Sequence, residues 1–243
     1  MAASVLGEFL GTTVLILLGN GVVAGVSLDQ SKARDAGYLA VTTGWAFAVL
    51  AGVLVAQALG APGELNPAVT IANVVGGTRT AADAVGHILA QFAGAILGAT
   101  LVWVHYLPHW RATGDAARIR GCFCNAPAIP AAGANLAAEV IATAVLVLVA
   151  GAIGSRGVLG ASPATNVGPV LVGALVWGIG LSLGGPTGYA INPARDLGPR
   201  IAHALLPIAN KGGSDWGYAW IPVVGPLVGG VLAALLLAAV VPA

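Results

Sequence analysis

Six long stretches of mostly apolar residues run through this chain of 243 residues. A helix needs about 20 apolar residues to cross roughly 30 Å of hydrocarbon, and each of these stretches meets that length. Only 8% of the residues are charged, whereas a soluble domain carries about a quarter. The sequence therefore predicts an all-α membrane protein. The predicted transmembrane helices are residues 5–26, 38–60, 83–106, 135–155, 167–185 and 217–241.

Two further segments are apolar but too short to span, and they cover residues 66–76 and 192–205. Each begins with Asn-Pro-Ala after a stretch rich in Gly and Pro. Asn is a good helix cap, and Pro suits the first turn, where its missing N–H is not needed. Short helices with broken entries at matching places in two halves indicate the functional site of a membrane protein.

The two halves of the chain repeat one pattern. Glu8 and Glu139 each open a Glu-x-x-x-Thr sequence at the start of a span, and each half reads span, span, half-helix, span. Three spans per half require the second half to be inverted, so the half-helices enter from opposite faces and meet at the midplane. The sequence predicts one channel domain over residues 1–243, an inverted repeat of about 1–107 and 133–243 with six transmembrane helices and two re-entrant half-helices.

The double motif resembles the aquaporin (major intrinsic protein) family over essentially the whole chain. Its two copies are Asn66-Pro67-Ala68 and Asn192-Pro193-Ala194, and the run from Tyr189 to Pro199 is similar to the glycerol facilitator branch in particular. One copy alone would be an ordinary capped helix start. The resemblance implies a multi-pass protein of the cell membrane, embedded in the lipid bilayer of a prokaryotic inner or plasma membrane and assembled as a homotetramer.

The physics of the two half-helices agrees with this resemblance. Each N-terminus carries roughly half a positive charge, and the Asn66 and Asn192 amides can donate N–H to a permeating oxygen. Protons and cations then meet a positive barrier. The broken backbone before each half-helix leaves carbonyls free, which membranes tolerate only beside a water-filled cavity. The predicted pore carbonyls belong to Pro62, Gly63, Glu64, Gly188, Tyr189 and Ala190.

Arg195 is the most informative single residue. An intramembrane Arg is costly and usually faces a cavity, although pairing with Asp196 or reaching the interface is an alternative. The resemblance places Arg195 in a selectivity filter with Trp45, Gly180 and Tyr189. Water-selective members carry His at the position of Gly180, so we expect a wider constriction, with an aromatic corner for a CH backbone and Arg195 for hydroxyls.

Further residues gain a role from the resemblance. Four match residues that separate glycerol facilitators from water channels: Asp196, Arg200, Pro226 and Leu227. The resemblance suggests that Glu8 and Glu139 orient loop carbonyls through backbone N–H bonds, with a proton relay as the alternative. Gln91 is expected to donate a hydrogen bond between helices. The His residues lack ligand spacing with acids or cysteines, so we expect no metal, and we expect no cofactor. No nucleophile, base or metal constellation appears, so we expect no enzymatic activity.

Three features do not follow from the family pattern. Most family members have His where this chain has Glu64, which could add negative charge or a titratable gate, or be neutralised by a nearby donor. Cys122 and Cys124 are too close in sequence to pair well, which leaves coincidence or an intermolecular link. The family's orientation puts six of the basic residues outside, against the positive-inside rule. They are Lys32, Arg34, Arg111, Arg118, Arg120 and Lys211.

The expected function is a passive channel for glycerol and other small uncharged solutes, with water, that excludes ions and protons. The alternatives within the class are a water-selective aquaporin and a channel for solutes such as urea or metalloid acids. An ion- or proton-coupled transporter would need coupling acids aimed at its substrate, and Glu8 and Glu139 are the candidates. The formal net charge of +1 gives no indication of a nucleic-acid partner.

Overall fold

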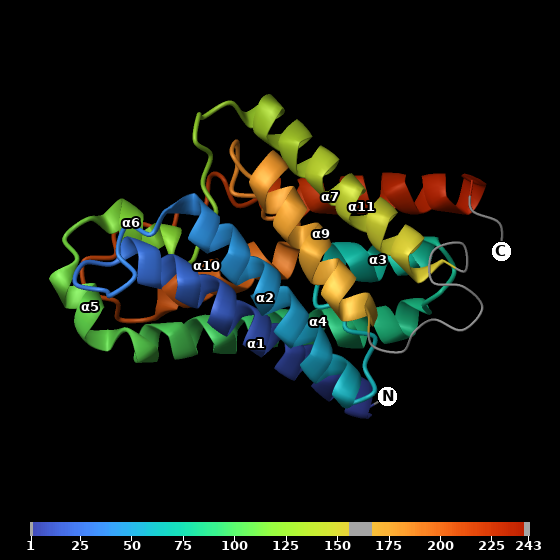
Figure 1. Cartoon of the computed structure of the whole chain (residues 1–243), viewed down its shortest axis with the longest axis horizontal. Coiled ribbons are helices and arrows are strands. Elements are labelled where there is room, and N and C mark those ends of the chain that lie inside the picture. The colour runs from blue at the N-terminus through green and yellow to red at the C-terminus, as the bar shows by residue number, and fades with distance from the viewer. Residues whose placement is uncertain (1, 156–166, 241–243) are drawn as a thin grey trace.

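The computed structural model describes residues 2–155 and 167–240, and within these residues it is all-helical. The N-terminal half contains α1 (Ala2–Ser27), α2 (Gly37–Ala58), α3 (Pro67–Val75) and α4 (Ala81–His105). Two short helices follow, α5 (Leu107–Ala112) and α6 (Ala116–Gly121). The C-terminal half contains α7 (Ala132–Gly154), α9 (Val167–Leu183), α10 (Pro193–Leu205) and α11 (Ile221–Val240). Figure 1 shows the long helices as a slanted bundle.

The predicted spans correspond to six long helices of the described residues. Five of these, α1, α2, α4, α7 and α11, are long and apolar enough to cross a membrane, and α9 is an apolar helix of 17 residues. The predicted start of the last span, residue 217, was wrong. Residues 216–220 form turns, in which the N–H of Tyr218 donates to the Asp215 carbonyl, and α11 begins only at Ile221. Pro222 then occupies its first turn, which proline tolerates.

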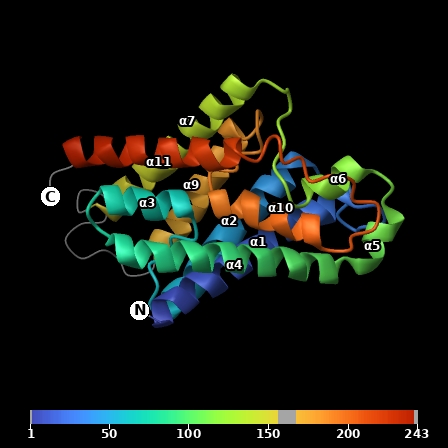
Figure 2. The ribbon, with the colours of Figure 1, turned by 180° about the vertical axis from the view of Figure 1, so that it is seen from behind.

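The half-helices α3 and α10 lie end to end in the middle of the bundle (Figure 2). Each packs against the last long helix of both halves, α4 and α11. The other main contacts are α1 with α2 and α4, α7 with α11, and α2 with α9. The N-termini of the two half-helices are therefore held together by helices from both halves of the chain.

Glycines allow the closest helix contacts. A Cβ atom on Gly94 in α4 would collide with the carbonyl of Phe9 in α1. In the other half, a Cβ atom on Gly229 in α11 would collide with the carbonyl of Val140 in α7. Small residues at such crossings let helix backbones approach each other, as membrane helices require.

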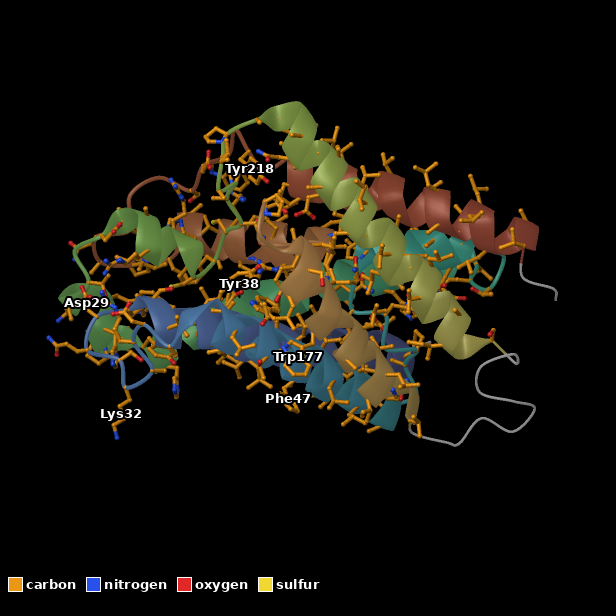
Figure 3. All side chains as sticks on the ribbon, turned by 45° about the horizontal axis from the view of Figure 1, so that its top comes forward. Asp29, Lys32, Tyr38, Phe47, Trp177 and Tyr218 are labelled. Atoms are coloured by element: carbon orange, nitrogen blue, oxygen red, sulfur yellow. The ribbon has the colours of Figure 1, made fainter. Side chains whose placement is uncertain are left out.

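Polar and apolar side chains are distributed along the bundle as a membrane requires. Asp29 and Lys32 lie at one end, in the loop after α1 (Figure 3). Phe47 of α2 and Trp177 of α9 lie on the outer surface between the ends, and both are exposed (Figure 3). A long outer surface of exposed apolar side chains is what a hydrocarbon environment favours and water does not.

Candidate pore and filter

The two Asn-Pro-Ala motifs start α3 and α10 in the same way. Both Asn residues have extended backbone with φ −157°, and each is followed by Pro in the first turn. The Asn66 Oδ1 accepts the N–H of Ala68 at 2.9 Å. The Asn192 Oδ1 accepts the N–H groups of Ala194 at 3.0 Å and Arg195 at 3.2 Å. The side-chain oxygens are thus occupied by caps, which leaves the amide nitrogens to face outward from each helix.

The two Asn amides also join the loops to each other. Asn66 Nδ2 donates to the Ile191 carbonyl at 2.7 Å, and Asn192 Nδ2 donates to the Leu65 carbonyl at 2.8 Å. Each carbonyl precedes the Asn of the other motif, and both Leu65 and Ile191 have left-handed backbone, with φ 51° and 45°. An amide group has two N–H donors. One N–H of each Asn is therefore used in this reciprocal link and one remains.

The two buried glutamates hold the loops that precede the half-helices. Glu8 accepts the N–H groups of Gly63, Glu64 and Leu65 at 2.8 to 2.9 Å. Gln91 of α4 donates to the same carboxylate at 2.8 Å, which confirms the expected bond between helices.

Glu139 has the matching place in the second half. It accepts the N–H groups of Ala190 at 2.9 Å and Ile191 at 2.8 Å, and the hydroxyl of Thr187 at 2.6 Å. Both glutamates are fully buried. Their carboxylates therefore face the N–H side of the loops.

A cavity of about 540 Å³ runs between the halves. Trp45, Tyr189 and Arg195 line one part of it, Asn66 and Asn192 line it near the motifs, and further lining comes from residues near the ends of α3 and α11. Polar lining comes from the loops at Pro62, Gly63, Glu64 and Ala190. Much of the rest is aliphatic, including Leu15, Val49, Val53, Val69, Leu146 and Val176. The cavity lining therefore combines polar loop groups with many aliphatic side chains.

Some predicted pore residues lie away from this lining. Pro67, Ala68, Pro193 and Ala194 are buried within the half-helix packing. Gly188 is not a lining residue, and its carbonyl accepts a hydrogen bond from Asn125 Nδ2 at 2.9 Å. The expectation that the Gly188 carbonyl faces the pore therefore needs correction, because a side chain from another loop occupies it.

The Arg195 guanidinium lies over the indole of Trp45, with its central carbon 4.1 Å from the ring centroid. Such a contact stabilises a cation in a site with little water. Asp196 does not take part, because both of its oxygens accept bonds from Arg200 at 2.9 Å. Among the described residues, Arg195 thus has the cavity-lining position rather than an ion pair with its neighbour.

Gly180 makes room for Tyr189. A Cβ atom on Gly180 would lie 2.9 Å from Cζ of Tyr189 and 3.0 Å from Cγ2 of Thr42. The Tyr189 ring lies in the space that a side chain at this position would occupy, and the wider constriction expected from Gly180 stays a prediction. The Tyr189 hydroxyl is buried and has no hydrogen-bond partner among the described residues.

The Glu64 side chain is neutralised by donors. Its carboxylate accepts bonds from Asn73 Nδ2 at 2.6 Å, Arg79 Nε at 2.9 Å and the Thr70 hydroxyl at 2.7 Å. The sequence left three alternatives for Glu64: added negative charge, a titratable gate or neutralisation by a nearby donor. This geometry supports neutralisation by nearby donors.

Glu64 also belongs to a cluster that sequence spacing did not reveal. Oxygens of Glu8 and Glu64 and a ring nitrogen of His87 lie within 4.8 Å of one another. Both carboxylates are already occupied by the N–H and O–H donors described above. A metal ion would have to displace those donors, so the cluster is a hydrogen-bond junction of the first pore loop.

The glycerol-type positions lie outside the cavity lining. Asp196 and Arg200 are fully buried and form an ion pair within α10. Pro226 is buried inside α11, and Leu227 is half-buried beside it. Sequence reasoning missed Asn125, Arg79 and His87, because their partners are 15 to 71 residues away along the chain.

Comparison with known proteins agrees with this geometry. The family model for the major intrinsic proteins matches residues 1–237. The chain belongs to the major intrinsic protein family. It is 54% identical to glycerol uptake facilitator protein 3 of Lactiplantibacillus plantarum, over 97% of this chain and 96% of that protein. It is 51% identical to the glycerol uptake facilitator protein of Streptococcus pneumoniae, over 97% and 98% of the two chains.

A solved structure of this family has the same fold. The X-ray structure of the aquaglyceroporin from Plasmodium falciparum aligns with a TM-score of 0.86 at 27% identity, covering 99% of this chain and 96% of that one. The chain is thus a multi-pass membrane protein with the aquaporin fold, as its sequence predicted.

Proposed function

We propose that this major intrinsic protein is a passive channel for glycerol and other small uncharged solutes, with water, across the plasma membrane. The observation that carries the proposal is the cavity, whose lining combines aliphatic side chains, polar loop groups and the side chains of Trp45, Tyr189 and Arg195. A polyol likewise combines CH groups with hydroxyls. The names of the two bacterial relatives support glycerol as the solute.

In this proposal Asn66 and Asn192 hold the permeating oxygen. Each retains one amide N–H beyond the reciprocal link and lies at the positive end of a half-helix. A hydroxyl or water oxygen accepts these N–H groups, so neither motif can pass a proton along. Cations meet the positive ends of both half-helices.

The filter consists of Trp45, Tyr189 and Arg195, with Gly180 as the position that admits the Tyr189 ring. The two aromatic rings contact the CH backbone of the solute, and the Arg195 guanidinium donates to its hydroxyls. The carbonyls of Pro62, Gly63, Glu64, Tyr189 and Ala190 act as acceptors along the pore. Glu8 and Glu139 orient these loops. Asp196 and Arg200 form a buried ion pair within α10, and Pro226 and Leu227 are the two further positions that match glycerol facilitators.

The proposal extends to the chain as a whole. Residues 1–243 form one channel domain of two repeats, about 1–107 and 133–243, and the functional assembly in the bilayer is a homotetramer. Transport needs no cofactor and no catalytic residue, because the solute moves down its own gradient.

A solute panel tests this function. Proteoliposomes holding the purified protein are mixed with equal osmolarities of glycerol, urea or sucrose, and light scattering follows their volume. We expect rapid re-swelling in glycerol, slower entry of urea and none of sucrose. A protein that speeds only the initial water loss would be a water-selective channel, and the glycerol assignment would then fail.

A further inference from the structure

The loop that joins α6 to α7 passes alongside α10 (Figure 2) and carries Asn125. This residue lies 67 positions before Asn192 in the chain and is only 6% exposed. Nothing in the proposed transport steps uses its side chain. Its hydrogen bonds, however, all go to residues 187–200, the segment that contains Tyr189 and Arg195.

The Asn125 backbone is fixed by the buried ion pair of α10. Its N–H donates to Asp196 Oδ1 at 2.7 Å, and its carbonyl accepts from Arg200 Nη2 at 2.9 Å. Arg200 also donates to the carbonyls of Ser214 at 2.6 Å and Asp215 at 2.8 Å. Hydrogen bonds to charged groups are stronger than neutral ones, so this anchor is firm.

The side-chain amide of Asn125 reaches the filter loop. Its Nδ2 donates to the carbonyls of Thr187 at 3.0 Å and Gly188 at 2.9 Å. The amide cannot be turned over without placing its oxygen against two carbonyl oxygens. This orientation leaves Asn125 Oδ1 buried without a partner among the described residues, a cost that the two donated bonds offset.

The same loop is held from its other side by Glu139, which binds the Thr187 hydroxyl and the Ala190 N–H. Between these anchors, Gly188 and Tyr189 adopt left-handed backbone with φ 74° and 40°. Such a conformation is unfavourable for Tyr and persists only where neighbouring contacts impose it. Asn125 supplies the contacts on the carbonyl side.

We propose that Asn125 is a positioning residue of the filter. By holding the Thr187 and Gly188 carbonyls it sets the direction of the Tyr189 ring, and so it tunes how much glycerol the channel passes relative to water. This inference rests on the proposed glycerol function. Water is small enough to pass a loosened filter, whereas glycerol depends on the aligned positions of Tyr189, Trp45 and Arg195.

Two variants test the role, Asn125→Asp and Asn125→Ala. The first keeps the shape of the side chain and removes both donated N–H bonds, and the second removes the side chain beyond Cβ. The backbone bonds to Asp196 and Arg200 remain possible in both. The matched control is Asn135→Ala, because Asn135 is also buried and its amide donates to a carbonyl of the same long loop, that of Ile129 at 3.1 Å, outside the filter.

Glycerol and water permeabilities are measured in proteoliposomes for each variant and normalised to the amount of reconstituted protein. We expect both Asn125 variants to lower the glycerol-to-water ratio severalfold, because both donated hydrogen bonds are lost, while Asn135→Ala leaves it unchanged. A purely structural role would lower both permeabilities together. If Asn125→Ala does not insert into the membrane, the permeability ratio of Asn125→Asp alone tests the inference.

An unchanged ratio in Asn125→Asp would overturn the inference, and so would an equal change in the Asn135→Ala control. Failure of the proposed function is a separate result, because it would appear as absent glycerol flux in the wild-type channel.

Discussion

The central guanidinium carbon of Arg195 lies over Trp45, 4.1 Å from the centre of the indole ring. The same ring packs against Gly19 of α1, where any Cβ atom would collide with it. Trp45 is therefore held by two contacts, one with the Arg195 cation and one with α1. Trp45 and Arg195 also line the cavity, and we refer to Arg195, Trp45 and Gly19 together as the Trp45 slot.

Gly19→Ala tests this slot. The added methyl group has to move the Trp45 ring, so we expect glycerol permeability to fall several-fold and the free energy of unfolding to fall by about 1–3 kcal/mol. The control is Gly21→Ala on the same helix, where nothing lies within 4 Å of the new Cβ atom. Equal permeabilities for the two variants would mean that the position of Trp45 does not limit glycerol.

Gly180→Ala tests the space that Tyr189 occupies. A Cβ atom there would lie 2.9 Å from the Tyr189 ring, which has to shift toward the pore, so glycerol flux should fall more than water flux. Gly178→Ala is the control, because a Cβ atom on Gly178 meets nothing within 4 Å. Stopped-flow measurements of both permeabilities check the prediction, and a parallel loss of both would contradict the filter assignment.

Variants of the Glu64–Arg79 ion pair test how the protein stabilises Glu64, which stands where most family members have His. The Glu64 side chain is 3% exposed and that of Arg79 is 19% exposed. Removing either charge leaves the other poorly solvated, so Glu64→Gln and Arg79→Gln should each destabilise the protein. The double variant should lose less than the sum, with a coupling of about 0.5–3 kcal/mol. Additive losses in thermal or denaturant unfolding would show that the two charges do not interact.

The two cysteines give a prediction about pH. Burial raises the pKa of the Cys124 thiol to about 12 and also raises that of Cys122. An unfolded thiol has a pKa of about 8.5, so the folded state favours the neutral thiols. Their contribution to stability is present below pH 8.5 and is lost as pH rises toward 12.

Because only the thiolate reacts, alkylation by a maleimide at pH 7 to 9 should be slow in the native protein and fast after denaturation. Mass spectrometry counts the modified thiols. Rapid labelling of the native protein would contradict the burial of these two free cysteines, and it would reopen the intermolecular link that the sequence left possible.

Much of the fold could be predicted because local chemistry dictates it. The apolar spans are long, and Asn66-Pro67 and Asn192-Pro193 are helix starts by themselves. The last span shows the limit, since residues 216–220 are apolar enough for a helix but form turns before Pro222.

The details of the site depended on partners far away in the chain. Arg79 donates a hydrogen bond to Glu64, and Asn125 donates one to the loop before Asn192. Neither pair can be predicted from the spacing of these residues in the sequence. The sequence also does not show whether a glycine such as Gly180 leaves a space open or yields it to a neighbour. Only the position of the Tyr189 ring decides between these possibilities.

The most direct test of the central claim is the glycerol flux of the reconstituted wild-type protein with and without ion gradients. Proteoliposomes in hyperosmotic glycerol should shrink and then re-swell much faster than protein-free vesicles. The rate should be the same with no gradient, a proton gradient or a sodium gradient, and no proton current should accompany it. Re-swelling that requires a gradient, or that does not exceed the rate of empty vesicles, would contradict a passive glycerol channel.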